Sequence, residues 1–192
     1  MDVLSSPVVR AVVAVALPIV VFFGAGWIMV KISGQEPATQ RIEALRARED
    51  RTPLNRRLHY DADAVSRYWK PLKDDLTARA AEQRLLELDL VFPFLYGGAL
   101  AAGLLLVWAG LGRRFAPAWV MAPVAVGMVA DWTENLVQLS QLRRYTAGEA
   151  LDGGWIALAG AATLVKIVCL TLACGLLLVL AAWLLFSPSR PS

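Results

Sequence analysis

The sequence predicts an all-α fold: a bundle of four transmembrane helices with a small helical cap outside the membrane. Three observations lead to this prediction. The chain of 192 residues is 57% hydrophobic, whereas about half of a typical soluble domain is apolar. Four apolar segments each reach the length of about 20 residues that spans a bilayer. Finally, 12 of the 19 basic and 11 of the 16 acidic residues lie in one stretch, between Lys31 and Asp89.

The first apolar segment, residues 11–30, contains no charged side chain and is predicted to be transmembrane helix 1. A secretory signal peptide is the alternative interpretation, because Arg10 precedes the apolar run. The run is longer than the apolar region of a usual signal peptide, and its sequence GAGW matches a cleavage site poorly. We therefore expect an uncleaved membrane anchor.

The polar region, residues 31–89, is predicted to form the cap. It opens with the breaker-rich stretches GQEPATQ and RTPLN, which are typical of loops. A first cap helix is expected after Asp61 or Asp63, either of which can serve as its N-cap. A second is expected to start near Asp74 and to continue into the next apolar segment. The apolar positions that recur at helical spacing in the first of these are Val65, Tyr68 and Leu72.

Transmembrane helices 2, 3 and 4 are predicted at residues 90–112, 117–141 and 155–186. The connection RRFAPA is so short that helices 2 and 3 should form an antiparallel pair. The fourth segment is longer than a span requires, so it is expected to tilt or to project from the membrane. Tryptophans near the segment ends fit an aromatic belt at the membrane surfaces. They are Trp27, Trp108, Trp119, Trp155 and Trp183.

Small residues and flanking charges complete the prediction for the bundle. Glycines should allow close helix packing, at Gly97, Gly98 and Gly103 in helix 2 and at Gly160 in helix 4. Lys and Arg residues occur at similar density on both sides of the membrane. Because Arg10 precedes a charge-free anchor, we expect both termini in the cytoplasm.

The third apolar segment carries polar side chains at Asp131, Glu134, Gln138 and Gln141. Spacings of three, four and three residues place them on one stripe of a helix. Exposing this stripe to lipid would cost at least about 2.5 kcal/mol for each central carboxylate. The stripe is therefore predicted to face the interior of the bundle.

Two further polar groups fall at the depth of these carboxylates when residues are counted from the predicted turns. Lys166 in helix 4 and Tyr96 in helix 2 are both level with Asp131 and Glu134. Pro93, just before Tyr96, should leave a backbone carbonyl without its helical donor. In a structural interpretation, Lys166 neutralises one carboxylate and the amides satisfy the rest. In a functional interpretation, which we favour, the unbalanced carboxyl group takes up a proton, a cation or a polar ligand.

Several classes of function are excluded or disfavoured. No run of basic residues suggests nucleic acid. The sole histidine, His59, lies in the polar region, so haem held by two histidines in the membrane and a zinc site of His and Cys are not expected. Cys169 and Cys174 form no CxxC motif and are interpreted as small apolar residues. No cofactor or metal is predicted, although Asp131, Glu134 and Asn135 supply oxygen ligands.

Two motifs, LDLVFPFLYG at residues 88–97 and DWTEN at residues 131–135, carry a resemblance. The pair is similar to LDxxFPxxY and DxxEN in small bacterial four-helix membrane proteins of no established activity, over residues 64–141. The resemblance implies a bacterial inner-membrane protein. It also groups six residues: Asp89, Pro93, Tyr96, Asp131, Glu134 and Asn135.

A looser similarity exists to the carboxylate-and-tryptophan site of sterol-isomerase and sigma-2-receptor-like four-helix proteins. It is carried by the sequence WTEN, which includes Trp132. The histidine that such an isomerase would use is missing here. This similarity therefore implies a lipid-like ligand more than an isomerisation.

Together, these observations favour a protein that binds or translocates a small amphiphilic, lipid-like or cationic ligand. Its expected partners are membrane lipids and that ligand. One alternative is a non-catalytic accessory subunit that assembles with other membrane protein subunits. Another is a lipid-modifying enzyme with Glu134 as acid or base. The candidate site comprises Asp131, Glu134, Asn135, Lys166, Tyr96, Trp132, Gln138 and Asp89.

Overall fold

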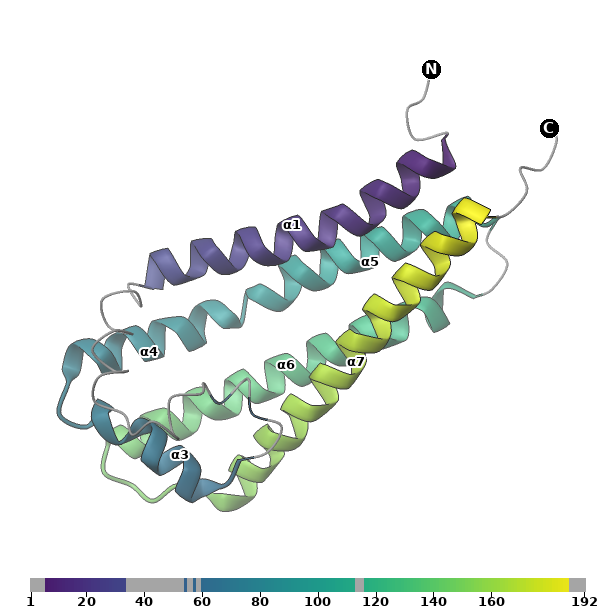
Figure 1. Ribbon diagram of the computed structural model, residues 1–192. Helices are drawn as coiled ribbons and strands as arrows, with labels where there is room; N and C mark the ends of the chain where they lie inside the picture. Colours follow the sequence, from purple (N-terminus) through teal and green to yellow (C-terminus); the bar gives the residue numbers. More distant parts are fainter. Residues whose placement is uncertain (1–5, 34–53, 55–56, 58–59, 113–115, 187–192) are drawn as a thin grey trace.

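A computed structural model describes residues 6–33, 54, 57, 60–112 and 116–186, and this part of the chain contains helices and no strand. The all-α prediction is thus confirmed. Most of the two breaker-rich stretches, and His59, lie outside the described residues. The helices are α1 (Pro7–Ser33), α3 (Ala62–Trp69), the short 3-10 helix η4 (Lys70–Leu72), α4 (Leu76–Asp89), α5 (Phe92–Gly110), α6 (Pro117–Thr146) and α7 (Gly153–Phe186) (Figure 1).

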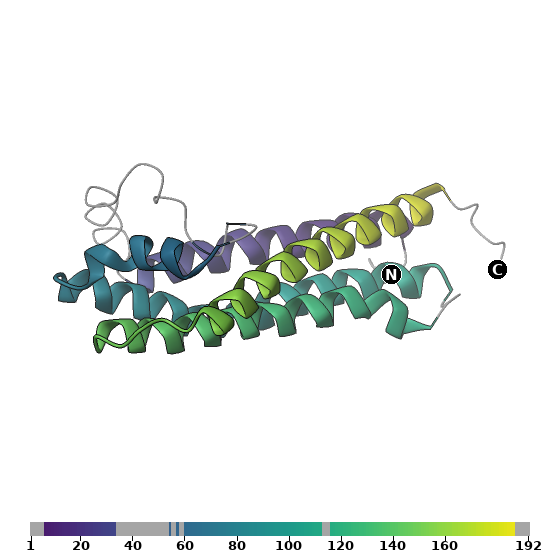
Figure 2. The same cartoon turned by 90° about the horizontal axis from the view of Figure 1, so that it is seen from below.

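The long helices run back and forth along one axis. Helix α1 lies beside α4 and α5, and α6 lies beside α7 (Figures 1 and 2). The start of α1 and the ends of α5 and α7 lie at one end of the bundle, whereas α3 lies at the opposite end. We call the α3 end the cap end. The predicted antiparallel arrangement of the second and third apolar segments appears as α5 and α6.

Within the described residues, three helices are long and apolar enough to cross a membrane, at Pro7–Ile32, Leu76–Gly110 and Gly153–Phe186. Helix α6 falls outside this set, because the polar residues in its second half lower its hydropathy. Large apolar side chains are exposed along all these helices, as expected of surfaces that meet lipid tails. Four of the five predicted belt tryptophans are among the exposed residues: Trp27, Trp119, Trp155 and Trp183.

Helix α6 continues to Thr146, five residues beyond the predicted end of its apolar segment. The extra turn packs under the cap, where Leu142 and Tyr145 are buried. Burial in a protein contact, which hydropathy alone does not reveal, extends the helix beyond its apolar segment. Helix α7 then begins at Gly153 after a short turn.

The cap helix α3 packs onto the ends of α6 and α7. Its Val65, Tyr68 and Trp69 join Leu142 and Ile156 in one hydrophobic core. Asp61 is the N-cap, as predicted, because its Oδ1 accepts a hydrogen bond of 2.8 Å from the backbone N–H of Ala64. The periodic apolar residues of the first cap helix therefore face the bundle.

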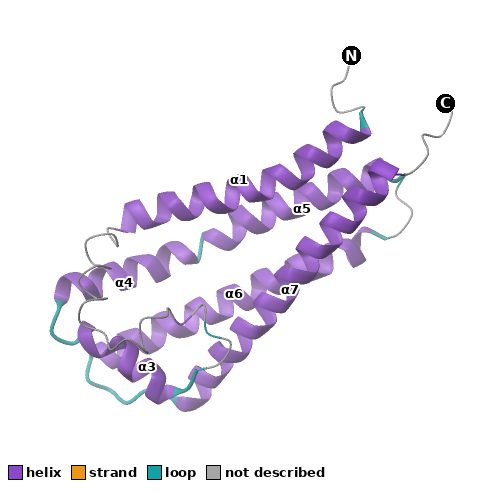
Figure 3. Cartoon of the chain, viewed as in Figure 1, coloured by secondary structure: helices purple, strands orange, loops and turns teal. Residues whose placement is uncertain are grey.

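The second cap helix, α4, starts at Leu76 with Asp75 as its N-cap. It is separated from α5 by a short break at Leu90 and Val91 (Figure 3). Pro93 explains this break, because proline has no N–H to donate to the carbonyl four residues earlier and its ring crowds that carbonyl. Phe94 N–H instead bonds to the carbonyl of Val91, three residues away, at 3.1 Å.

Small residues join α1 to α5 at the end opposite the cap. Ala11 and Ala14 are buried there. A Cβ at Gly103 would collide with the carbonyl oxygen of Ala14, so the two backbones are in direct contact. Gly98, one and a half turns away, has nothing within 4 Å of its Cβ position. The glycine prediction thus holds for Gly103 and fails for Gly98, which faces outward.

Gly103→Ala should therefore lower the stability of the bundle by about 1–3 kcal/mol, the usual cost of overpacking a close contact. Gly98→Ala is the matched control and should be neutral or slightly stabilising, because alanine is the better helix former. Thermal unfolding in mild detergent, followed by circular dichroism, measures both variants. Equal melting temperatures for the two variants would contradict the close contact of α1 and α5.

Candidate functional site: a buried ionic cluster below the cap

A lysine lies between two carboxylates inside the bundle. The Nζ atom of Lys166, on α7, donates to Asp131 Oδ1 at 3.0 Å and also to Glu134 Oε2, both on α6. All three residues are buried, with 8%, 3% and 0% of their surfaces exposed. The predicted stripe of α6 therefore faces inward, and its two carboxylates meet Lys166, the lysine that lies level with them.

Tyr96 completes the cluster from α5. Its hydroxyl donates a hydrogen bond of 2.7 Å to Asp131 Oδ2. The rings of Phe22, on α1, and Phe92, on α5, pack against the Tyr96 ring, with centroid distances of 6.2 and 5.2 Å. These aromatic contacts separate the Asp131 carboxylate from the outer surface of α1.

Asn135 links the cluster to the break between α4 and α5. Its Nδ2 atom donates to Asp131 Oδ1 at 3.2 Å and to the backbone carbonyl of Asp89 at 3.1 Å. The side chain is fully buried, yet its Oδ1 atom has no hydrogen-bond partner. A buried acceptor without a donor costs about 1–3 kcal/mol. The cluster therefore contains an acceptor that a ligand's N–H or O–H could satisfy.

Tyr60, which the sequence did not single out, closes the cluster on the cap side. Gln138 Nε2 donates to the Tyr60 hydroxyl oxygen and to Glu134 Oε1, both at 3.0 Å. Burial, together with the charge of Glu134, raises the pKa of Tyr60 above its ordinary value. The hydroxyl thus keeps its proton at neutral pH. One signal pointed to Tyr60: an apolar residue directly before an N-cap, here Asp61, usually packs inward.

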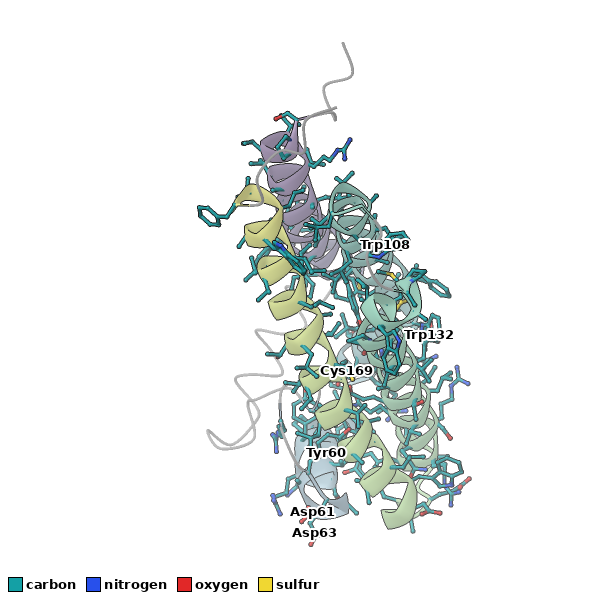
Figure 4. All side chains as sticks on the ribbon, turned by 90° about the vertical axis from the view of Figure 1, so that its right-hand side faces the viewer. Tyr60, Asp61, Asp63, Trp108, Trp132 and Cys169 are labelled. Carbon is teal, nitrogen blue, oxygen red and sulfur yellow. The ribbon has the colours of Figure 1, made fainter. Side chains whose placement is uncertain are left out.

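Trp132 and Gln141 lie beside the cluster without contributing to it. Trp132 Nε1 donates to the carbonyl of Leu90 at 2.8 Å, and its ring packs on Phe94. In Figure 4, Trp132 lies between Trp108 and Tyr60 along the bundle. Gln141 Oε1 accepts from the N–H of Asp152 at 2.9 Å, so it fixes the turn between α6 and α7.

The cluster has more carboxyl groups than ammonium groups. Asp89, half-buried at the end of α4, lies close enough to Asp131, Glu134 and Lys166 to interact with their charges. Asp131 and Glu134 both contact the ammonium of Lys166, and the Asp89 carboxyl group adds a third acidic group near them. Such an excess of buried negative charge must be balanced by protons or by a bound cation. Within the part of the chain that the structure describes, no group of three His, Cys, Asp or Glu side chains could hold a metal ion.

The structure brings together seven of the eight sequence-predicted site residues and leaves Trp132 outside. The fold is an all-helical bundle with helices long and apolar enough for a membrane protein and with buried charged residues at its centre. Comparison of the chain with protein-family models, with curated proteins and with solved structures finds no match. The resemblance of the motif pair to bacterial four-helix proteins therefore stays a prediction, and the interpretation of the site depends on its own geometry.

Lys166→Met should lower the free energy of unfolding by about 3–5 kcal/mol, because it leaves two buried carboxylates without their counter-ion. Adding Asp131→Asn and Glu134→Gln to this variant removes those charges and should restore much of the loss, since the three residues interact directly. Denaturant unfolding in detergent micelles measures the variants. Unchanged stability of Lys166→Met would show that the ammonium is not the counter-ion of these carboxylates.

Proposed function

We propose that this protein is a four-helix integral membrane protein that binds the protonated amine group of a small amphiphilic ligand in its buried ionic cluster. One observation carries the proposal. Asp131 and Glu134 share a single ammonium while a third acidic group, Asp89, lies near enough to interact with their charges, and the buried Oδ1 atom of Asn135 lacks a donor. In hydrocarbon, ionisable groups are costly, and they usually serve substrates, ions or protons.

The chain's path supports a fourth transmembrane span. Helices α5 and α7 both run from the cap end toward the opposite end (Figure 1). If both cross the membrane, α6 must carry the chain back across it. Its charged groups are tolerated there because they face α5 and α7 rather than lipid.

The cluster's own lysine supports an amine as the ligand. The ammonium of Lys166 lies between Asp131 and Glu134 and donates to both. The two carboxylates thus already bind one ammonium group inside the bundle. Two further acceptors lie nearby, the Asp89 carboxyl group and the neutral amide oxygen Asn135 Oδ1, and no second lysine of the described residues is bound to them. A second ammonium, carried by a ligand, would balance the charge.

The two alternatives have less support. A lipid-modifying enzyme needs a free acid or base, whereas both oxygens of Glu134 are engaged, one by Lys166 and one by Gln138. A purely structural role in an accessory subunit does not explain why Asn135 Oδ1 is left without a donor. The bacterial inner membrane, with both termini in the cytoplasm, is the setting that we propose from the sequence.

Hexylammonium is a suitable probe, and hexanol is its uncharged counterpart of equal chain length. Hexylammonium should raise the melting temperature of the detergent-solubilised protein in a concentration-dependent manner, because a ligand that binds the folded state stabilises it. Hexanol should raise it far less. Asp131→Asn should weaken the apparent affinity at least tenfold, since it removes a buried counter-charge.

Glu149→Gln is the matched control, because Glu149 is an exposed carboxylate in the turn after α6; its affinity for hexylammonium should equal that of the wild type. The proposal fails if hexanol stabilises the protein as well as hexylammonium does, or if Asp131→Asn leaves the affinity unchanged. Mass spectrometry of molecules that copurify in mild detergent then separates the alternatives. A stoichiometric protein partner in place of an amine would favour the accessory subunit.

A further inference from the structure

We infer that the break before Pro93 is a hinge through which ligand binding in the ionic cluster changes the tilt of α4. This inference rests on the proposed function and adds a regulated movement to it. The residues that carry it are Asp89 and Leu90 on one side, and Trp132 and Asn135 on the other. The side chains of Trp132 and Asn135 each donate to a backbone carbonyl that the break has left without its helical donor.

The break leaves two carbonyls without their helical donors. Asp89 O would bond to the N–H of residue 93, which proline lacks. Leu90 O would bond to the N–H of Phe94, which instead donates to Val91. In their place, Asn135 Nδ2 donates to Asp89 O at 3.1 Å and Trp132 Nε1 donates to Leu90 O at 2.8 Å. Two side chains of α6 therefore fix the end of α4.

The side-chain amide of Asn135 contacts both the hinge and the cluster. Its Nδ2 atom serves Asp89 O and Asp131 Oδ1, while its Oδ1 atom accepts no hydrogen bond. An ammonium that enters the cluster offers N–H donors, which attract Oδ1. Rotation of the amide to present Oδ1 to the ligand withdraws Nδ2 from Asp89 O. Ligand binding and the capping of α4 then compete for the same side chain.

Such a movement would have to involve the packing of α4, whose Ala78 and Leu86 lie in the hydrophobic core under the cap. One polar contact between α4 and α6 is the ion pair of Glu87 and Arg143 at 3.6 Å, with both side chains largely exposed. Exposed ion pairs contribute about 0–1 kcal/mol. At its far end, α4 is joined to η4, because the Arg79 guanidinium donates to the carbonyls of Leu72 and Lys73. A tilt of α4 would therefore be transmitted to the cap.

Spin labels on the full-length protein in detergent micelles test the hinge by electron–electron distance measurement. One label replaces Leu76, exposed at the start of α4, and its partner replaces Ser140, exposed on α6. Alanine replaces Cys169 and Cys174. Hexylammonium should shift this distance by about 3–4 Å, because α4 is about 21 Å long and a rotation of about 10° moves its end that far.

The control pair lies across α5 and α6 on the other side of the break. Labels at Leu105 and Val126, both exposed, should keep their distance when hexylammonium binds. Pro93→Ala supplies the missing N–H to Asp89 O, so this variant should bind hexylammonium while losing the shift. Trp132→Phe removes the donor to Leu90 O and should broaden the Leu76–Ser140 distance distribution before any ligand is added.

The possible results separate this inference from the proposed function. A shift at Leu76–Ser140 alone, abolished by Pro93→Ala, supports the hinge. If hexylammonium raises the melting temperature but the distance stays constant, the cluster binds amines and the hinge is refuted. An equal shift at both label pairs also refutes it, because the movement is then not centred on the break. If hexylammonium does not bind, the proposed function fails and the inference fails with it.

Discussion

The ammonium of Lys166, held between Asp131 and Glu134, is the interaction on which the rest of the structure depends. Two carboxylates cannot remain charged in a bundle surrounded by hydrocarbon unless a counter-charge lies within reach. That requirement sets the rotation of α6, whose polar stripe must face inward. It also sets the register of α7, which must place Lys166 at the depth of the two carboxylates. The apolar faces of both helices are then directed outward or to α5.

The same requirement explains how the surroundings of the cluster are built. Polar groups from α5 and α6 reach the carboxylates, and Gln138 links Glu134 to Tyr60, which closes the cluster on its cap side. On the side of α1, aromatic rings cover Tyr96. The break before Pro93 adds two exposed carbonyls at the same depth, and α6 satisfies both. Neighbouring residues of α6 thus supply both the carboxylates of the cluster and the donors to the two backbone carbonyls.

Much of this arrangement could be predicted from the sequence. Helical spacing placed Asp131 and Glu134 on one face, and counting from the turns placed Tyr96 and Lys166 at their depth. Pro93 predicted a carbonyl without its donor. These inferences succeeded because periodicity and rise per residue are local properties of the chain. Tyr60 was missed because its position depends on how the cap folds back over α7, and the extension of α6 to Thr146 was missed because it depends on burial under the cap. The outward orientation of Gly98 likewise required the packing of α5 against its neighbours.

The division of the cluster between α6 and α7 has a consequence for how the protein is synthesised and inserted into a membrane. Both carboxylates of α6 are synthesised before Lys166 is added to the chain. Placed alone in the bilayer, it would carry those carboxylates without a counter-ion, at a cost of about 2.5 kcal/mol or more for each. The following helix, α7, carries the cation and is long and apolar enough to cross a membrane. Integration of α6 is therefore expected to be completed by α7, with the two helices partitioning from the translocon as a hairpin whose charges neutralise each other on the way in.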